Sequence, residues 1–272
     1  MRDDARPRVC VWLRIVPAAW MLCALATRLA MAQTSPPHIN VVFPAGGQRG
    51  QTVEATVTGL DLRAATAVHV SGGGVVGKVV EAQQPAAKPA ASKQSKFGRQ
   101  AKETETVRIS IAIAPDAELG VRDLRLITPG GVSNRYRFVV GQLREVAEVE
   151  PNSTRAQAQR LESLPVVVNG QVFEADADMY RFTAKAGQTI VCEAHGQRLL
   201  PFIADAVPGW LQAELTLYDA EGRELMHVDD FRFQPDPVLI YKVEKDGEYL
   251  VEIKDALYRG RGDFVYRLSV GA

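Results

Sequence analysis

Hydrophobic and polar residues alternate along much of the chain, starting at Ile39. The alternation is clearest in "QTVEATVTG" (51–59), "TVRISIAIA" (106–114) and "NRYRFVV" (134–140). Successive residues of a strand point to opposite faces, so each run predicts a half-buried β-strand. Turn clusters such as "PAGGQRG", "SGGG" and "TPGG" separate the runs. Short strands at this spacing are typical of an immunoglobulin-like β-sandwich.

A second series of strand-like runs follows Gly141. It predicts seven or eight strands, in "VVVNGQVFE", "MYRFTAKAG", "QTIVCEAHG", "AELTLYDAEG", "ELMHVDD", "VLIYKVEKDGEYLVEIKDA" and "FVYRLSVGA". Within them, "KDGE" (245–248) predicts a tight hairpin, because Asp-Gly suits the positive dihedrals of such a turn, and Tyr249, Val251 and Ile253 are expected to face inward beyond it. The only predicted helix is a short one at 153–161, which Ser153 or Thr154 would cap.

Residues 1–32 have the layout of a secretory signal peptide. Early arginines are followed by an apolar stretch and by Ala30-Met31-Ala32, an A-x-A cleavage site. A membrane anchor is disfavoured, because only thirteen uncharged residues lie between Arg14 and Arg28, against the roughly 20 needed to span a bilayer. We therefore expect the protein to be exported.

The rest of the chain predicts two domains of one all-β fold class. An immunoglobulin-like domain is expected at 37–142 and a second β-sandwich at 143–272. Residues 82–104 are rich in Ala, Gln, Pro and Lys, so they cannot bury a core and predict a flexible insertion in the first domain.

Charge and cysteine content narrow the classes of function. The chain has 32 Lys and Arg and 32 Asp and Glu, and removing the five arginines and two aspartates of residues 1–32 leaves 27 and 30. A chain so close to neutral offers no general basic surface for nucleic acid. Cys10 and Cys23 leave with the signal, so Cys192 has no disulfide partner and is predicted to be a small hydrophobic strand residue.

Oxygen-bearing side chains concentrate at two places in the second domain. "EVEPNST" (148–154) has Glu148, Glu150 and Asn152 at alternate positions, and "ADADMY" (175–180) has Asp176 and Asp178. Residues two apart in an extended chain point the same way, so each cluster can direct its oxygens to one spot. Calcium binds about six to eight oxygens. Two interpretations stay open: the clusters meet around calcium, or "EVEPNST" is a solvated linker.

Several motifs of the second domain occur in a recognisable order. "EVEPN", "NGQVFE", "DADMYRF", "KAGQTI", "LTLYDAEGREL", "DGEYLVEI" and "YRLSV" run from about residue 145 to 271. Together they resemble the bacterial pre-peptidase C-terminal (PPC) domain. That resemblance implies a compact jelly-roll-type β-sandwich of the kind appended to secreted peptidases, whose relatives include the calcium-holding, collagen-binding modules of bacterial collagenases.

Carried over by position, the resemblance implies core roles for Tyr180 and Phe182. It implies a structural calcium ion with the ligands Glu148, Glu150, Asn152, Asp176 and Asp178. The sequence departs from the family pattern at Ser153, where an acidic or amide residue is common, and at Ala175, where glycine usually stands. The first domain is similar to immunoglobulin-like domains of the IPT/TIG type, and the tandem resembles exported proteins of planctomycete type.

The sequence offers no recognisable catalytic motif. His38, His69, His195 and His227 are scattered without H-E-x-x-H spacing, and there is no G-x-S-x-G elbow. We therefore expect a non-catalytic accessory or binding module, in the periplasm, at the cell surface or outside the cell, that contacts an extracellular protein or polysaccharide.

Other interpretations remain beside this one. The chief alternative is a structural spacer or assembly component of the cell envelope without a soluble ligand, and a hydrolase is less favoured. We expect no nucleic-acid partner and no membrane span after signal cleavage. An exposed aromatic cluster would favour the binding module, and a uniformly charged surface would favour the spacer.

Overall fold

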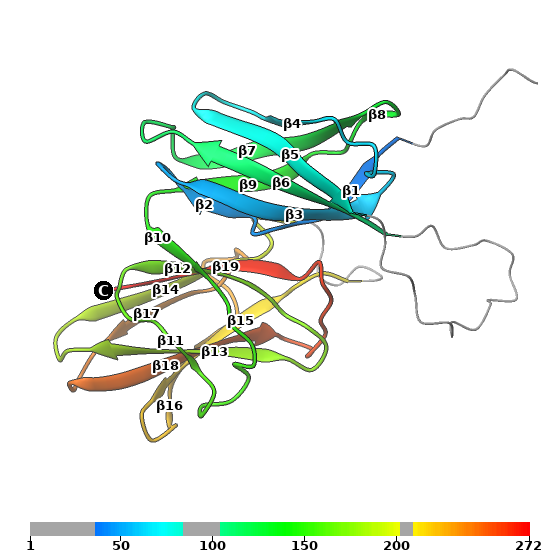
Figure 1. Ribbon diagram of the computed structural model, residues 1–272. Helices are drawn as coiled ribbons and strands as arrows, with labels where there is room; N and C mark the ends of the chain where they lie inside the picture. Colours follow the sequence, from blue (N-terminus) through cyan, green and yellow to red (C-terminus); the bar gives the residue numbers. More distant parts are fainter. Residues whose placement is uncertain (1–35, 84–103, 202–208) are drawn as a thin grey trace, which may run out of the picture. The chain divides into compact units, whose positions relative to one another are not determined.

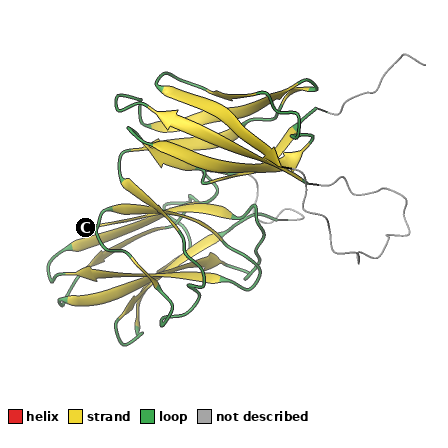
Figure 2. Cartoon of the chain, in the orientation of Figure 1, coloured by secondary structure: helices red, strands yellow, loops and turns green. Residues whose placement is uncertain are grey.

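Two β-sandwiches make up the part of the chain that the structure, a computed structural model, describes. The described residues are 36–83, 104–201 and 209–272, and within them every regular element is a strand (Figures 1 and 2). The prediction of an all-β fold is therefore confirmed. None of these residues belongs to a helix long and apolar enough to cross a membrane. The predicted signal peptide lies outside the described residues.

The first sandwich consists of two sheets. One has the strand order β1-β3-β6-β5, and the other has the order β2-β9-β7-β4, with β8 paired to β7. Its strands are β1 (His38–Phe43), β2 (Gly46–Gln48), β3 (Thr52–Leu60), β4 (Ala67–Val70), β5 (Val75–Gln83), β6 (Glu105–Ile113), β7 (Gly120–Thr128), β8 (Gly131–Val132) and β9 (Tyr136–Gly141).

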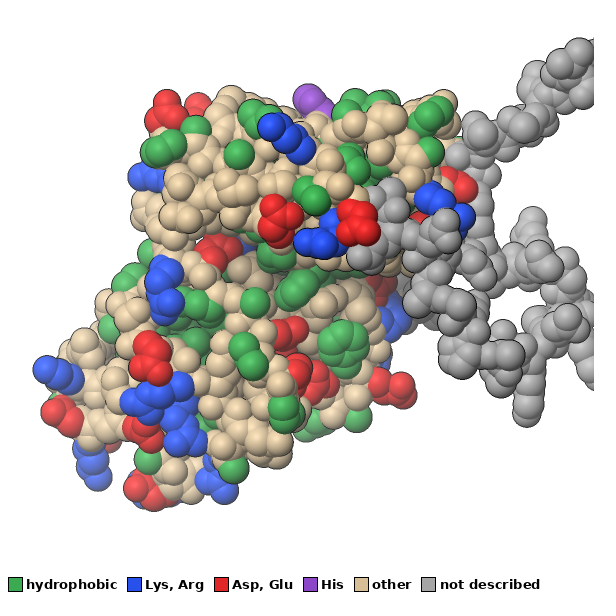
Figure 3. Space-filling view, viewed as in Figure 1, with side chains coloured by type: hydrophobic (Ala, Val, Ile, Leu, Met, Phe, Trp, Pro, Cys, Tyr) green, Lys and Arg blue, Asp and Glu red, His purple; other side chains and the backbone are tan. Residues whose placement is uncertain are grey.

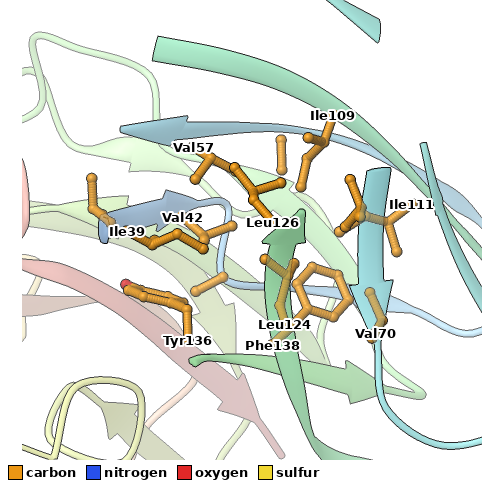
Figure 4. Packing of buried hydrophobic residues seen from close by; sticks show 14 of the residues in the cluster. Ile39, Val42, Val57, Val70, Ile109, Ile111, Leu124, Leu126, Tyr136 and Phe138 are labelled. Atoms are coloured by element: carbon orange, nitrogen blue, oxygen red, sulfur yellow. The ribbon is translucent and has the colours of Figure 1, made fainter. Parts of the chain in front are cut away.

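The alternating runs of the first sandwich place one face of each strand in its core. In the antiparallel pair β3 and β6, Val57 lies opposite Val107 and Ala55 lies opposite Ile109, and all four side chains are buried. Figure 4 shows these faces packed against those of the second sheet, which contributes Leu124, Leu126, Tyr136 and Phe138 among others. The period-two pattern thus predicted both the strands and their buried faces.

The second sandwich also has two sheets, with the strand orders β10-β12-β19-β14-β17 and β11-β13-β18-β15-β16. The pairs β10–β12 and β11–β13 are parallel, and the others are antiparallel. Its strands are β10 (Arg144–Ala147), β11 (Gln159–Arg160), β12 (Val166–Gln171), β13 (Ala177–Ala184), β14 (Thr189–His195), β15 (Ala213–Asp219), β16 (Glu224–Val228), β17 (Val238–Lys242), β18 (Gly247–Asp255) and β19 (Val265–Gly271). Eight of these strands were predicted, and the short β10 and β11 were not.

Cys192 lies in β14 within the core of the second sandwich. Its side chain is fully buried, and burial raises the pKa of the thiol to about 12. Cys192 therefore packs as a hydrophobic residue, as predicted.

The predicted hairpin at "KDGE" is wrong. β17 pairs with β14, whereas β18 pairs with β13 and β15, so the turn joins strands of opposite sheets. The Asp246 carboxylate accepts a hydrogen bond from the backbone N–H of Ala186 at 2.7 Å instead of closing a hairpin. Tyr249, Val251 and Ile253 are buried, as predicted.

The predicted helix at 153–161 is also wrong. Gln159 and Arg160 form β11, and the N–H of Leu161 donates to the Arg181 carbonyl at 2.8 Å, so this segment pairs with β13. Pairing with an adjacent strand satisfies backbone groups that a nine-residue helix would leave open at its ends. The predicted insertion at 82–104 lies almost wholly outside the described residues, although β5 continues through Gln83.

Candidate metal site

The backbone brings the two acidic segments of the second sandwich together. The segment at 148–152 directly follows β10, and Asp176 and Asp178 flank Ala177, the first residue of β13. On one side, the N–H of Glu148 donates to the carbonyl of Asn169 in β12 at 3.0 Å. On the other side, the N–H of Met179 in β13 donates to the carbonyl of Asn152 at 3.1 Å. The segment is therefore held between β12 and β13.

Three carboxylates converge at this place. Glu148, Glu150 and Asp178 each offer an oxygen, and these oxygens all lie within 4.8 Å of one another. Calcium holds its oxygens at roughly 2.3–2.6 Å, so two ligands of one ion can lie no more than about 5 Å apart. The cluster therefore has the dimensions to bind a metal ion such as calcium.

The other two predicted ligands lie beside this cluster. Asp176 accepts hydrogen bonds from the hydroxyl of Ser153 at 2.9 Å and from the N–H of Ala177 at 3.0 Å. Ser153, which departs from the PPC pattern, thus fixes Asp176. Asn152 is fully buried, and its N–H donates to the Glu150 carboxylate at 2.9 Å.

Among the described residues, Asn152 and Asp178 have buried polar atoms without a hydrogen-bond partner, which a cation site would explain. Asp178 is fully buried, and its Oδ1 has no hydrogen-bond partner among the described residues. The same holds for Oδ1 and Nδ2 of Asn152. A buried polar group without a partner costs about 1–3 kcal/mol, and a charged one costs more. A cation between these residues would satisfy the Asp178 oxygen, so the residues present fit such an ion.

Two buried tyrosines support Asp178 from the core. The hydroxyl of Tyr266, in β19, donates to Oδ2 of Asp178 at 2.7 Å and contacts the hydroxyl of Tyr180. Tyr180 and Phe182 are buried, as expected of core residues. Sequence reasoning assigned no role to Tyr266, although it belongs to the motif "YRLSV".

Gly170 leaves the space that Tyr266 and Glu148 occupy. The two residues Gly170 and Tyr266 face each other across β12 and β19. A Cβ on Gly170 would lie 2.2 Å from the Tyr266 hydroxyl oxygen and 2.4 Å from Oε2 of Glu148. The glycine of "NGQVFE" is thus explained by the close approach of these two side chains.

Burial and mutual repulsion make the carboxylates hard to ionise without a cation. Burial raises the pKa of Asp178 to about 8, and the charges of Glu148, Asp176 and Glu150 act in the same direction, against the hydrogen bond from Tyr266. Burial likewise raises the pKa of Glu148 to about 7, with a further rise from the Glu150 charge, against the hydrogen bond from the N–H of Gln171. A bound cation would offset these costs.

The histidines lie elsewhere. Nε2 of His195 is 3.3 Å from the Glu193 carboxylate, and Nδ1 of His227 is 2.9 Å from the hydroxyl of Thr216. Thr216 is only 3% exposed, so a substrate has no access to its hydroxyl. His38 and His69 are exposed on strands of the first sandwich.

Known proteins match this chain over part of its length. No family model matches it. A probable subtilase-type serine protease of Deinococcus radiodurans is 32% identical over 125 residues, which are 44% of this chain and 16% of that protein. The chain thus spans a small part of this curated relative.

Three solved structures match this chain at low sequence identity and low TM-score. The pre-peptidase C-terminal domain of a Bacillus anthracis collagenase matches with a TM-score of 0.30 and 11% identity, over 46% of this chain and 98% of that domain. The secreted serine protease VesC of Vibrio cholerae matches with a TM-score of 0.27 and 9% identity, over 83% and 47%. A Bacteroides ovatus glucan-utilization protein, SGBP-B, solved with a mixed-linkage heptasaccharide, matches with a TM-score of 0.25 and 11% identity, over 82% and 75%.

Proposed function

We propose that this protein is an exported, non-catalytic binding module whose second sandwich is of PPC type and is stabilised by calcium. The observation that carries the proposal is the buried, unpartnered Oδ1 of Asp178 beside the carboxylates of Glu148 and Glu150. Asn152 and Asp176 complete the proposed ligand set. The ion would tie the segment at 148–152 to the start of β13.

The expected gain in stability is modest. Extracellular calcium modules have dissociation constants near 0.1–1 mM. With a dissociation constant of about 0.1 mM and calcium at about 1 mM, binding to the folded state alone adds about 1.4 kcal/mol to the free energy of unfolding. A shift of that size is measurable in a thermal melt.

Export and a polymeric partner belong to the same proposal. The layout of residues 1–32 supports export to the periplasm, cell surface or medium. On the face that Figure 3 shows, acidic and basic side chains are interspersed, which gives that face no basic area to attract nucleic acid. The domain limits 37–142 and 143–272, and the IPT/TIG character of the first domain, are part of this proposal. The partner would be an extracellular protein or polysaccharide.

Thermal melting of the whole chain in calcium and in chelator tests the calcium site. We expect the melting temperature of the wild type to rise with calcium. Asp178→Asn removes one charge and keeps the shape, so this variant should not respond to calcium. Because it also relieves repulsion within the cluster, it should be at least as stable as the wild type in chelator.

Asp229→Asn is the matched control, because Asp229 is exposed and lies outside the cluster. It should respond to calcium as the wild type does. Equal melting temperatures of the wild type with and without calcium would show that the acidic cluster does not take up calcium.

A further inference from the structure

The connection between β16 and β17 contains a strained turn. Phe231 and Gln234 exchange both of their backbone hydrogen bonds, at 2.9 and 3.0 Å, and enclose Arg232 and Phe233. These two central residues have φ values of 52° and 65°. Positive φ at both central positions defines a type I′ turn, in which Asn-Gly and similar pairs are strongly preferred. Two side chains with Cβ atoms make this backbone unfavourable.

The turn displays an aromatic side chain in water. Phe233 is 100% exposed, the highest value among the exposed large hydrophobic residues of the described chain. Arg232 is also exposed, and its guanidinium carbon lies 5.1 Å from the centre of the Phe231 ring. The positive φ opposes stability, and a fully exposed ring gains no burial energy that would offset this cost. Such combinations persist at sites where the displayed side chain has a use.

A cleft of about 400 Å³ lies beside the turn, within the usual size range of small-ligand sites. Asp236, which is 3% exposed, anchors its wall by accepting hydrogen bonds from the N–H groups of Gly196, Gln197 and Arg198. The Arg198 guanidinium joins Asp236 to Glu193 through contacts of 2.8 and 2.7 Å. The lining residues are Glu193, Arg198, Phe231, Arg232, Gln234, Asp236 and Val238.

The lining is suited to an uncharged, hydroxyl-rich ligand. Its two carboxylates, Glu193 and Asp236, are balanced by the two guanidinium groups of Arg198 and Arg232. A stable protein interface buries roughly 800 Å² a side around a more apolar centre, whereas the neighbours of Phe233 in the turn are polar. A sugar ring has an apolar C–H face that covers one aromatic ring, and its hydroxyls can both donate and accept hydrogen bonds.

We propose that the turn at 231–234 and the adjacent cleft bind an uncharged polysaccharide. Phe233 and Phe231 stack against sugar rings, and Gln234 and Arg232 hydrogen bond to hydroxyl groups. This inference rests on the proposed function as a binding module and names its site and ligand class. Phe233 is not among the residues that line the cleft, which favours a polymer over a single sugar, because successive rings of one chain can contact both.

Native gel electrophoresis of the whole chain in gels that contain one polymer each tests this site. The probes are hydroxyethylcellulose, galactomannan and soluble starch, with polygalacturonate as an acidic polymer and gelatin as a protein polymer. The variant Arg232→Asn/Phe233→Gly installs the preferred type I′ pair. It should lose at least 10-fold in affinity for an uncharged polysaccharide that retards the wild type, while its melting temperature rises by about 3 °C.

Tyr258→Gly is the matched control, because Tyr258 is also an exposed aromatic residue at positive φ, with φ of 52° and 55% exposure. It should bind as the wild type does. If the double variant binds as tightly as the wild type, the turn at 231–234 is not the binding site. The proposed function as a binding module would then still stand. Turn-dependent retardation by gelatin or polygalacturonate alone would overturn the ligand class. If no polymer retards the wild type, both this inference and the polymer-binding function are wrong, which leaves the spacer.

Discussion

Ala175, in the loop between β12 and β13, has a strained backbone conformation. Its φ is 59°, in the left-handed region that costs a residue with a Cβ about 1–2 kcal/mol. Its N–H donates to the Tyr258 carbonyl at 3.2 Å, and the N–H of Asp176 donates to the Phe173 carbonyl at 3.2 Å. The loop therefore holds Ala175 in this conformation immediately before Asp176. The glycine that the PPC pattern has at this position thus has a physical explanation.

Ala175→Gly should raise the free energy of unfolding by roughly 0.5–1 kcal/mol, measured by urea denaturation. Relief of the left-handed strain exceeds the entropy that glycine adds to the unfolded chain. The matched control is Ala177→Gly, two residues further on in β13, which should lower the free energy of unfolding because glycine weakens a strand. Destabilisation by both variants alike would contradict the strain at Ala175.

At the scale of elements, β10 is held to β12 and β19 by a buried ion pair. The Arg267 guanidinium in β19 contacts both oxygens of Glu145 in β10, at 2.7 and 2.8 Å. It also donates to the Asn169 side chain in β12 at 2.8 Å. The Arg267 and Glu145 side chains are only 4% and 11% exposed. Because β10 has only four residues, these contacts and its backbone pairing with β12 position the segment that follows it.

Glu145→Ala should lower the free energy of unfolding by about 3–5 kcal/mol, since it leaves the buried Arg267 charge without its partner. Chemical denaturation measures the change. Arg223→Ala is the control, because the ion pair of Arg223 with Asp219 has the same 2.7 Å distance but Arg223 is 73% exposed. An exposed pair contributes about 1 kcal/mol or less. A loss in Glu145→Ala no larger than in Arg223→Ala would show that the pair does not hold β10.

The stability of the whole protein should depend on pH and calcium together. The raised pKa values of Asp178, about 8, and Glu148, about 7, mean that without a cation the folded state binds more protons than the unfolded state between about pH 4 and pH 8. The free energy of unfolding should therefore fall as pH rises through this range. A bound cation stabilises the ionised carboxylates, so the increase in stability with calcium should grow with pH.

Urea denaturation at pH 5 and pH 7.5, with and without calcium, measures this dependence. The expected fall without calcium is on the order of 2–4 kcal/mol, since the two carboxylates influence one another and their shifts do not add. A Glu148→Gln/Asp178→Asn variant should lose most of the fall and of the calcium response. A calcium effect of equal size at both pH values would mean that these carboxylates do not take up the ion.

Two turns of the second sandwich differ from what their sequences predict. Asp-Gly at 246–247 indicates a turn, but the partners of β17 and β18 are set by the sheet that each strand joins, so the expected hairpin did not form. The turn at 231–234 shows the converse, because "FRFQ" contains neither Gly nor Asn and yet adopts type I′ geometry. Two aromatic residues on either side of an arginine were the only sign of this turn in the sequence.

The sequence by itself determined the all-β class, most of the strands and the buried face of each, because the alternation of side chains along a strand is a local property. It also marked Glu148, Glu150 and Asp178 as candidates. Only the tertiary structure decided that the segment after β10 and the start of β13 bring these carboxylates together beside Tyr266. The exposure of Phe233 was likewise decided by the tertiary structure. Those features depend on contacts between segments far apart in the chain, about which local periodicity carries no information.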